Sequence, residues 1–258
     1  MTSPAHSPSG KEKHMSSAPS KKQIFFSGLK GGIPIALGYL SVSFAFGISA
    51  AEGGLSPLSA LLISMTNLTS AGQLAGLSII FAGGSLFEMA LTQLTINLRY
   101  FLMSLSLSQH LAPGFSTPHR LLCAFGITDE IYAVASMRSS PVTPSYLYGL
   151  ILLPYLGWST GTALGALAGH VLPGNITSAL GIAIYGMFVA IVLPPAKRER
   201  GVLFVSLSAI ALSCTLSYVP LFSRVSSGFA IIICALVASA LGAWLFPRKE
   251  PGQEDKNT

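Results

Sequence analysis

Long apolar stretches, separated by short polar or glycine-rich breaks, fill the chain from Ile33 to Phe246. A helix needs roughly 20 mainly apolar residues to cross the hydrocarbon core of a bilayer. The stretches that reach or approach this length are 33–51, 58–82, 86–107, 120–137, 146–169, 176–193, 201–218 and 226–246. The pattern predicts an all-α fold, a polytopic bundle of seven to eight transmembrane helices.

The two ends of the chain differ from this apolar part. Residues 1–23 are rich in Ser, Pro and Lys, and we expect them to form a disordered basic tail. Residues 24–247 are expected to form one transmembrane domain, followed by a second polar tail at 248–258. No folded basic surface accompanies the lysines, so they indicate membrane topology rather than nucleic-acid binding.

Composition supports a membrane protein. Hydrophobic residues make up 51% of the chain, charged residues only 9%, and the mean hydropathy is +0.63. A soluble domain carries roughly 25% charged residues, which this chain lacks. The three cysteines have no CxxC spacing and the five histidines fall in tails or loops. No metal site and no cofactor are predicted.

The positive charges suggest an orientation. If 120–137 crosses the membrane, there are eight spans, and twelve Lys and Arg residues lie on the side of both termini, against Arg120 and Arg224 on the other. If this stretch does not cross, there are seven spans and the basic turn at 197–200 changes side. The positive-inside rule favours the crossing, with both termini cytoplasmic in a bacterial plasma membrane.

A permanent charge lies inside the third apolar stretch. Arg99 cannot lose its proton, and at mid-membrane it costs at least ~2.5–3.5 kcal/mol on insertion scales. The other charges deep inside an apolar stretch are Asp129 and Glu130. We expect Arg99 to meet one of these acids. Glu88, at the start of the same stretch, is expected near the cytoplasmic entrance and to matter less.

The second stretch is polar at its centre, with Thr69, Ser70 and Gln73. Two interpretations remain open here: an unbroken helix that packs in the interior, or a broken helix whose freed backbone lines a site. Glycines at every fourth position from Gly157 to Gly169 predict close helix contact. Residues 47–57 loosely echo 165–173, which makes an internal repeat a candidate feature.

Motifs in four different spans resemble a known family. They are Gly-Ile-Pro-Ile-Ala-Leu-Gly-Tyr at 32–39, Thr-Ser-Ala-Gly-Gln at 69–73, Asn-Leu-Arg-Tyr-Phe-Leu-Met-Ser at 97–104 and Thr-Asp-Glu at 128–130. Their order and spacing, over about residues 24–245, resemble the AzlC family, the large subunit of branched-chain amino acid exporters. The family commonly has His where this chain has Tyr100. The resemblance implies export of valine-like amino acids with a small AzlD-type partner subunit.

An amino acid substrate would present a carboxylate, an ammonium group and an apolar side chain. Arg99 could bind the carboxylate and Asp129 or Glu130 the ammonium. The candidate substrate-binding or coupling residues are Thr69, Ser70, Gln73, Asn97, Arg99, Thr128, Asp129 and Glu130. Candidates for an apolar pocket are Phe44, Phe46, Phe101 and Tyr132. For Arg99, a structural ion pair, substrate contact and a part in proton coupling all remain open.

Export against a gradient needs a source of energy other than ATP hydrolysis by this chain. No Walker A pattern is present, so the chain is not expected to bind or hydrolyse ATP, nor does it show an enzyme's catalytic arrangement. A carboxylate inside the membrane is a candidate proton carrier. The prediction is a proton-coupled secondary transporter. A passive channel or an importer of small amino acids is the alternative, because the residues fix neither substrate nor direction.

Overall fold

The computed structural model describes residues 20–169, 171, 186, 189, 192–222 and 224–247. Its helices in this part are α1 (Lys21–Glu52), α2 (Pro57–Thr66), α3 (Ser70–Phe81), α4 (Leu86–Ser108), α5 (Thr117–Phe125), α6 (Asp129–Ser136), α7 (Pro144–Gly169), α9 (Arg200–Tyr218), η1 (Pro220–Phe222) and α10 (Ser227–Leu245). The all-α helical prediction is confirmed. Most of the expected span 176–193 lies outside the described residues, as do residues 1–19 and 248–258.

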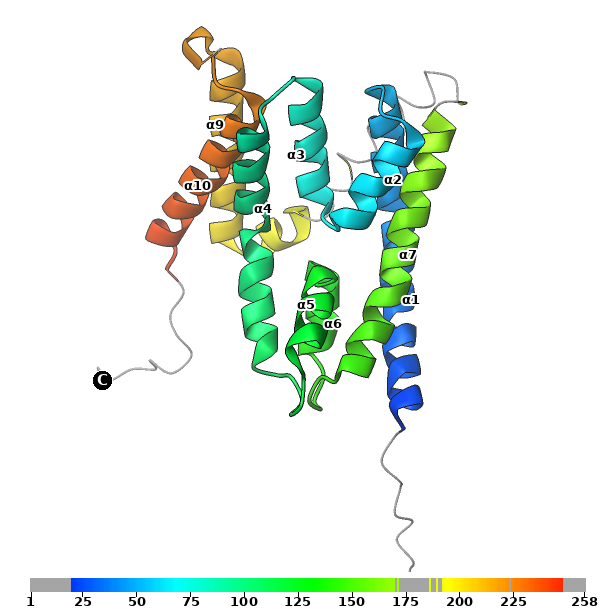
Figure 1. Cartoon of the computed structure of the whole chain (residues 1–258). Coiled ribbons are helices and arrows are strands. Elements are labelled where there is room, and N and C mark those ends of the chain that lie inside the picture. The colour runs from blue at the N-terminus through cyan, green and yellow to red at the C-terminus, as the bar shows by residue number, and fades with distance from the viewer. Residues whose placement is uncertain are drawn as a thin grey trace, which may run out of the picture.

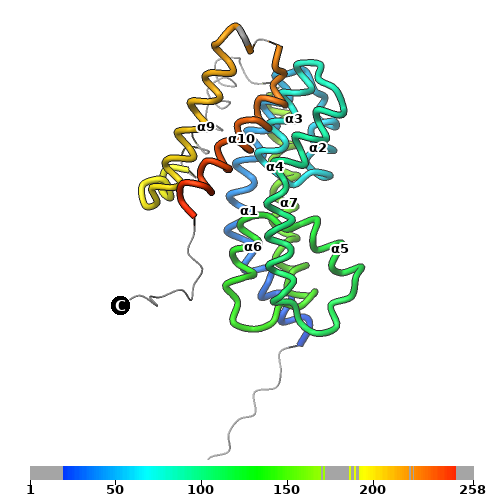
Figure 2. The backbone as a smooth tube through the Cα atoms, turned by 90° about the vertical axis from the view of Figure 1, so that its left-hand side faces the viewer, coloured from blue at the N-terminus to red at the C-terminus, as the bar shows by residue number. Residues whose placement is uncertain are grey.

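Two of the expected spans are instead half-length hairpins (Figure 1). The α2 helix runs from the end of the bundle where α1 finishes to its middle, and α3 returns to the same end. From the other end, α5 and α6 do the same, while α1, α4 and α7 run the length of the bundle (Figure 2). The tips of the hairpins, 67–69 and 126–128, therefore meet in the middle of the bundle.

Threonine residues begin the second helix of each hairpin. The side chain of Thr69 accepts a hydrogen bond from the Gly72 N–H, and that of Thr128 accepts one from the Ile131 N–H, both at 3.4 Å. A hydroxyl at this position satisfies one of the unpaired N–H groups of a new helix. The short chain segments before these caps are non-helical, so each apolar stretch is divided in two.

These hairpins correct the predicted topology. The predicted break within residues 58–82 is confirmed, and the unbroken helix is wrong. The predicted crossing of 120–137 is also wrong. Helix α5 ends at Phe125 and α6 begins at Asp129, and the two ends of the segment meet again, since Ala112 and His110 share backbone hydrogen bonds with Val142. The start of α1 and the outer ends of α5 and α6, with Lys21, Arg120 and Arg138, lie at one end of the bundle, called here the basic end (Figure 1). The start of α4, whose first turn contains Glu88, lies at the opposite end.

Four described helices are long and apolar enough to cross a membrane: α1, α7, α9 and α10. The 23-residue α4 is not among them, because its polar residues lower its hydropathy. The number of membrane crossings therefore stays a prediction. The α1 helix is longer than expected and starts at Lys21, where Ser20 and Gln23 form a capping box.

Helices α1 and α7 form a parallel pair with direct backbone contact. A Cβ added at Gly161 would overlap the Leu40 carbonyl, and one added at Gly165 would overlap the Phe44 carbonyl. The contact is reciprocal, since a Cβ at Gly28 would overlap the Tyr146 carbonyl. The predicted close contact along the glycines of this span is confirmed, with α1 as the partner.

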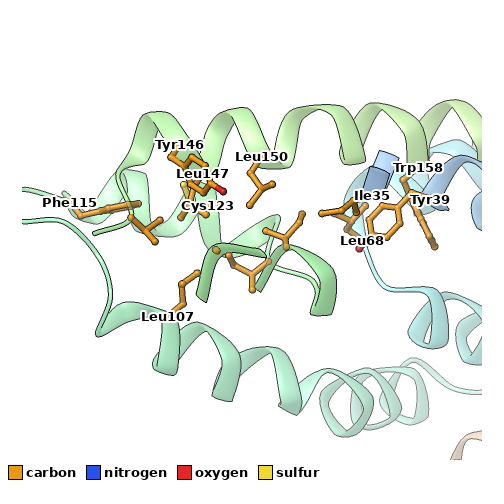
Figure 3. Packing of buried hydrophobic residues seen from close by; sticks show 14 residues of the cluster. Ile35, Tyr39, Leu68, Leu107, Phe115, Cys123, Tyr146, Leu147, Leu150 and Trp158 are labelled. Carbon is orange, nitrogen blue, oxygen red and sulfur yellow. The ribbon is translucent and has the colours of Figure 1, made fainter. Parts of the chain in front are cut away.

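A buried apolar cluster fills the space between this pair and the α5–α6 hairpin (Figure 3). Ile131 of α6 and Leu150 of α7 are fully buried in it, and Trp158 is 3% exposed. Near Trp158 the cluster ends at Tyr39 and Leu68, where Figure 3 shows the side chains of α1, α7 and the α2–α3 tip close together. This is the level at which the two hairpin tips meet.

Candidate functional site

A cavity of about 430 Å³ lies where the hairpin tips meet. It is lined by Pro34, Ile35, Gly38, Tyr39, Ser41 and Val42 of α1, Leu68 and Ser70 of the first hairpin, Tyr100 of α4, Thr128, Asp129 and Glu130 of the second hairpin, and Trp158 of α7. Small-molecule sites typically enclose about 300–1,000 Å³. The cavity is thus large enough for a small metabolite and combines an apolar wall with a few polar groups.

The first residues of two half-length helices face this cavity. Helix α3 begins at Ser70 and α6 begins at Asp129, and both residues line it. The first N–H groups of a helix have no partner within that helix and carry a partial positive charge. The first turn of α3 has no acidic residue, whereas that of α6 has Asp129 and Glu130. One tip therefore favours an anion and the other a cation.

Glu130 is held by a tyrosine from α1. The Tyr39 hydroxyl lies 2.5 Å from Glu130 Oε2 and 2.5 Å from Thr128 Oγ1. A phenol has one proton, so with an ionised Glu130 the hydroxyl of Thr128 donates to Tyr39, and Tyr39 donates to Glu130. The Tyr39 ring packs edge-on against Trp158 at 5.2 Å between centroids. These contacts fix one carboxylate oxygen of Glu130 at the cavity wall.

The predicted meeting of Arg99 with an acid is confirmed. Arg99 Nη1 lies 2.7 Å from Asp129 Oδ2, and both side chains are about half exposed. Arg99 also donates to the Tyr100 hydroxyl at 3.1 Å, and that hydroxyl donates to Thr69 Oγ1 at 3.5 Å. Arg99 does not itself line the cavity. It connects α4 to the second hairpin tip, and the neighbouring Tyr100 connects α4 to the first.

Two other predicted residues brace the first hairpin tip instead of lining the cavity. Gln73 is 1% exposed, and its Nε2 donates to Ser64 Oγ at 3.0 Å. Asn97 donates to Gln93 Oε1 at 3.1 Å, and Gln93 Nε2 in turn donates to the Gly72 carbonyl at 2.7 Å. Thr69 belongs with them as the cap of α3. Of the eight predicted residues, the structure places Ser70, Thr128, Asp129 and Glu130 on the cavity wall.

The aromatic candidates for an apolar pocket do not line this cavity. The cavity wall does not include Phe44, Phe46, Phe101 or Tyr132. Its apolar side comes from Ile35, Val42, Leu68 and Trp158. The sequence reasoning missed Tyr39 and Trp158, although Tyr39 ends the first motif. Within the described residues, the Nε1 of Trp158 is buried and has no hydrogen-bond acceptor.

Comparison with known proteins places these residues in a family context. The family model described as AzlC protein matches residues 34–172, a range that contains every residue lining the cavity. An uncharacterized membrane protein of Archaeoglobus fulgidus is 34% identical over 227 residues, covering 87% of this chain and 97% of the relative. The inner membrane protein YgaZ of Escherichia coli is 29% identical, covering 85% and 91%.

A third relative has a functional name. The branched-chain amino acid transport protein AzlC of Bacillus subtilis is 22% identical over 191 residues, covering 72% of this chain and 74% of the relative. No solved structure matches the chain.

Proposed function

This chain belongs to the AzlC family of membrane transporters, and we propose that it exports branched-chain amino acids such as L-valine. The observation that carries the proposal is the mid-bundle cavity between an anion-favouring tip and a cation-favouring tip. A zwitterionic amino acid presents these two charges on adjacent groups. The name of the Bacillus subtilis relative supports the same substrate class.

The tips suggest an orientation for the substrate. We place its carboxylate at the start of α3, against the first N–H groups of that helix and the hydroxyl of Ser70. We place its ammonium group at the Oε1 atom of Glu130, because the Oε2 atom is bound by Tyr39. The apolar side chain then contacts Ile35, Val42 and Leu68.

We propose that transport is coupled to protons through Glu130. The carboxylate can hold the substrate ammonium or a proton, but not both. A proton that enters from outside would release the substrate, and its departure to the cytoplasm would restore the anion for the next substrate. In this mechanism Arg99 binds Asp129 and thereby holds α4 on the α6 tip, so its role is that of a structural ion pair rather than of direct substrate contact.

The proposal includes an orientation and a partner. The start of α1 and the α5–α6 hairpin, which carry Lys21 and Arg120, lie at the basic end, and the turn between α9 and α10, which carries Arg224, lies at the opposite end (Figure 1). This distribution supports a cytoplasmic basic end in the plasma membrane. Both termini are proposed to be cytoplasmic. A small AzlD-type membrane subunit is proposed to complete the transporter, on the basis of the family.

Everted membrane vesicles test the proposal, because uptake into them corresponds to export from the cell. Vesicles from cells that express the chain, with and without an AzlD-type subunit, would be given labelled L-valine. We expect an acid interior to drive valine accumulation and a protonophore to abolish it. Glu130→Gln should abolish this accumulation at equal protein amount, while Glu52→Gln, at the exposed end of α1, should leave it intact.

Three results would contradict parts of the proposal. Absence of valine uptake in every preparation would refute the substrate class. Equal uptake with and without the gradient would indicate a passive channel. Accumulation only in right-side-out vesicles with an acid exterior would indicate an importer.

A further inference from the structure

Gly38 differs from its neighbouring glycines in α1. Cβ atoms added at Gly28, Gly32 or Gly47 would overlap the backbone of α7, so close packing explains these residues. A Cβ added at Gly38 would meet no atom of another described part of the chain within 4 Å. Gly38 lines the cavity instead. Helix packing therefore does not account for a glycine at this position.

A glycine in the middle of a helix has a cost. It is less favourable than alanine by roughly 0.5–1 kcal/mol, because the unfolded chain loses more conformational freedom. In α1 this cost is not offset by a close contact at Gly38. What the glycine provides is open space on the cavity side of the helix, directly before Tyr39, whose hydroxyl binds Glu130.

The space lies within the apolar wall of the cavity. Ile35 and Val42 precede and follow Gly38 by three and four residues, so the three positions share one face of the helix. All three line the cavity. A side chain at position 38 would project from the centre of this face and take up volume between its two apolar neighbours.

We propose that Gly38 determines the substrate specificity of this transporter by leaving room for a branched apolar side chain. The inference rests on the proposed function, in which Glu130 and Ser70 hold the polar groups and leave the side chain to this wall. Each methyl group added at position 38 then excludes the larger amino acids first. One methylene in a hydrophobic pocket typically changes discrimination by about 10–200-fold.

The test is a comparison of substrates rather than of total activity. Transport of L-alanine, L-valine and L-leucine would be measured in everted vesicles for the wild type, Gly38→Ala and Gly38→Val. We expect Gly38→Ala to lower the leucine-to-alanine rate ratio about tenfold and Gly38→Val to lower it further. Gly31→Ala is the matched control, because Gly31 is in the same helix, does not line the cavity and contacts only side chains.

The outcomes separate this inference from the function on which it rests. If the wild type transports none of the three amino acids, the proposed function fails. If the wild type transports valine and leucine but the ratios are unchanged in Gly38→Ala, the inference is wrong. An equal decline for all three substrates would also overturn it and would indicate a hinge between Pro34 and Gly38. Should Gly38→Ala be poorly produced, Gly38→Ser provides the same comparison.

Discussion

The guanidinium of Arg99 in α4 and the carboxylate of Asp129 at the start of α6 form an ion pair, with 2.7 Å between Nη1 and Oδ2. It joins a helix that runs the length of the bundle to the tip of a hairpin that reaches only its middle (Figure 1). Either charge alone would be expensive at this depth, and each therefore requires the other.

Removal of one charge should be worse than exchange of both. We expect Arg99→Gln and Asp129→Asn each to reduce valine transport at least about tenfold, because the remaining charge loses its partner. The double exchange Arg99→Asp with Asp129→Arg should recover part of the activity. Valine efflux per amount of membrane-inserted protein is the measurement. Full activity in both single variants would show that the pair has no functional role.

Tyr39→Phe should impair transport without unfolding the protein. The substitution keeps the edge-on contact with Trp158 but removes the hydrogen bond to Glu130. A hydrogen bond to a charged group contributes about 1.5–3 kcal/mol, so the rate at low valine concentration should fall roughly 10–100-fold. Tyr155→Phe serves as the control, because its hydroxyl binds the Met65 carbonyl away from the cavity. Equal rates for the two variants would argue against this role of Tyr39.

Gly161→Val should destabilise the bundle. Its side chain would overlap the Leu40 carbonyl and the Ser43 hydroxyl, and backbone atoms cannot move aside as side chains can. We expect a loss of more than the ~1–3 kcal/mol typical of overpacking, seen as a lower melting temperature in detergent. Gly31→Ala, which faces only side chains, should change the melting temperature little. A stable Gly161→Val variant would contradict the tight α1–α7 contact.

Glu88 should hold α10 on the rest of the bundle. It is 4% exposed, and its Oε1 accepts hydrogen bonds from Ser226 Oγ at 2.5 Å and from the Gly228 N–H at 2.8 Å. It therefore caps α10 from α4. We expect Glu88→Ala to make the segment between α9 and α10 more sensitive to protease and Glu88→Gln to have a smaller effect. Unchanged digestion of both variants would rule out this cap.

The ion pair of Arg99 could be predicted from the sequence, because a charge inside an apolar span is costly without a partner. Arg99 needs a partner, the chain offers two acids at a suitable place, and the structure pairs it with one of them. The helical membrane fold follows from the scarcity of charged residues. Tyr39 and Trp158 could not be chosen in this way, because aromatic residues are common in apolar spans and only the meeting of the hairpin tips places these two at the cavity.

The hairpins show why charge counting could not reveal the topology. Replacing two crossings by two hairpins leaves the side of Lys21 and Arg138 unchanged, so the count is favourable in both arrangements. Only the two segments around the joins between the hairpins and α4 change side, and these contain Glu88 and Arg120. Arg120 is the only Lys or Arg residue in these segments, and one basic residue is too weak a signal to distinguish a crossing helix from one that turns back.

The glycine-mediated contact between α1 and α7 limits how this protein can move. Their backbones touch at several levels, so sliding or rotation of one against the other would produce steric overlap. Any exchange between inward-open and outward-open states must then keep α1 and α7 together as one rigid unit. The elements that move relative to this pair are then α4 and the two hairpins.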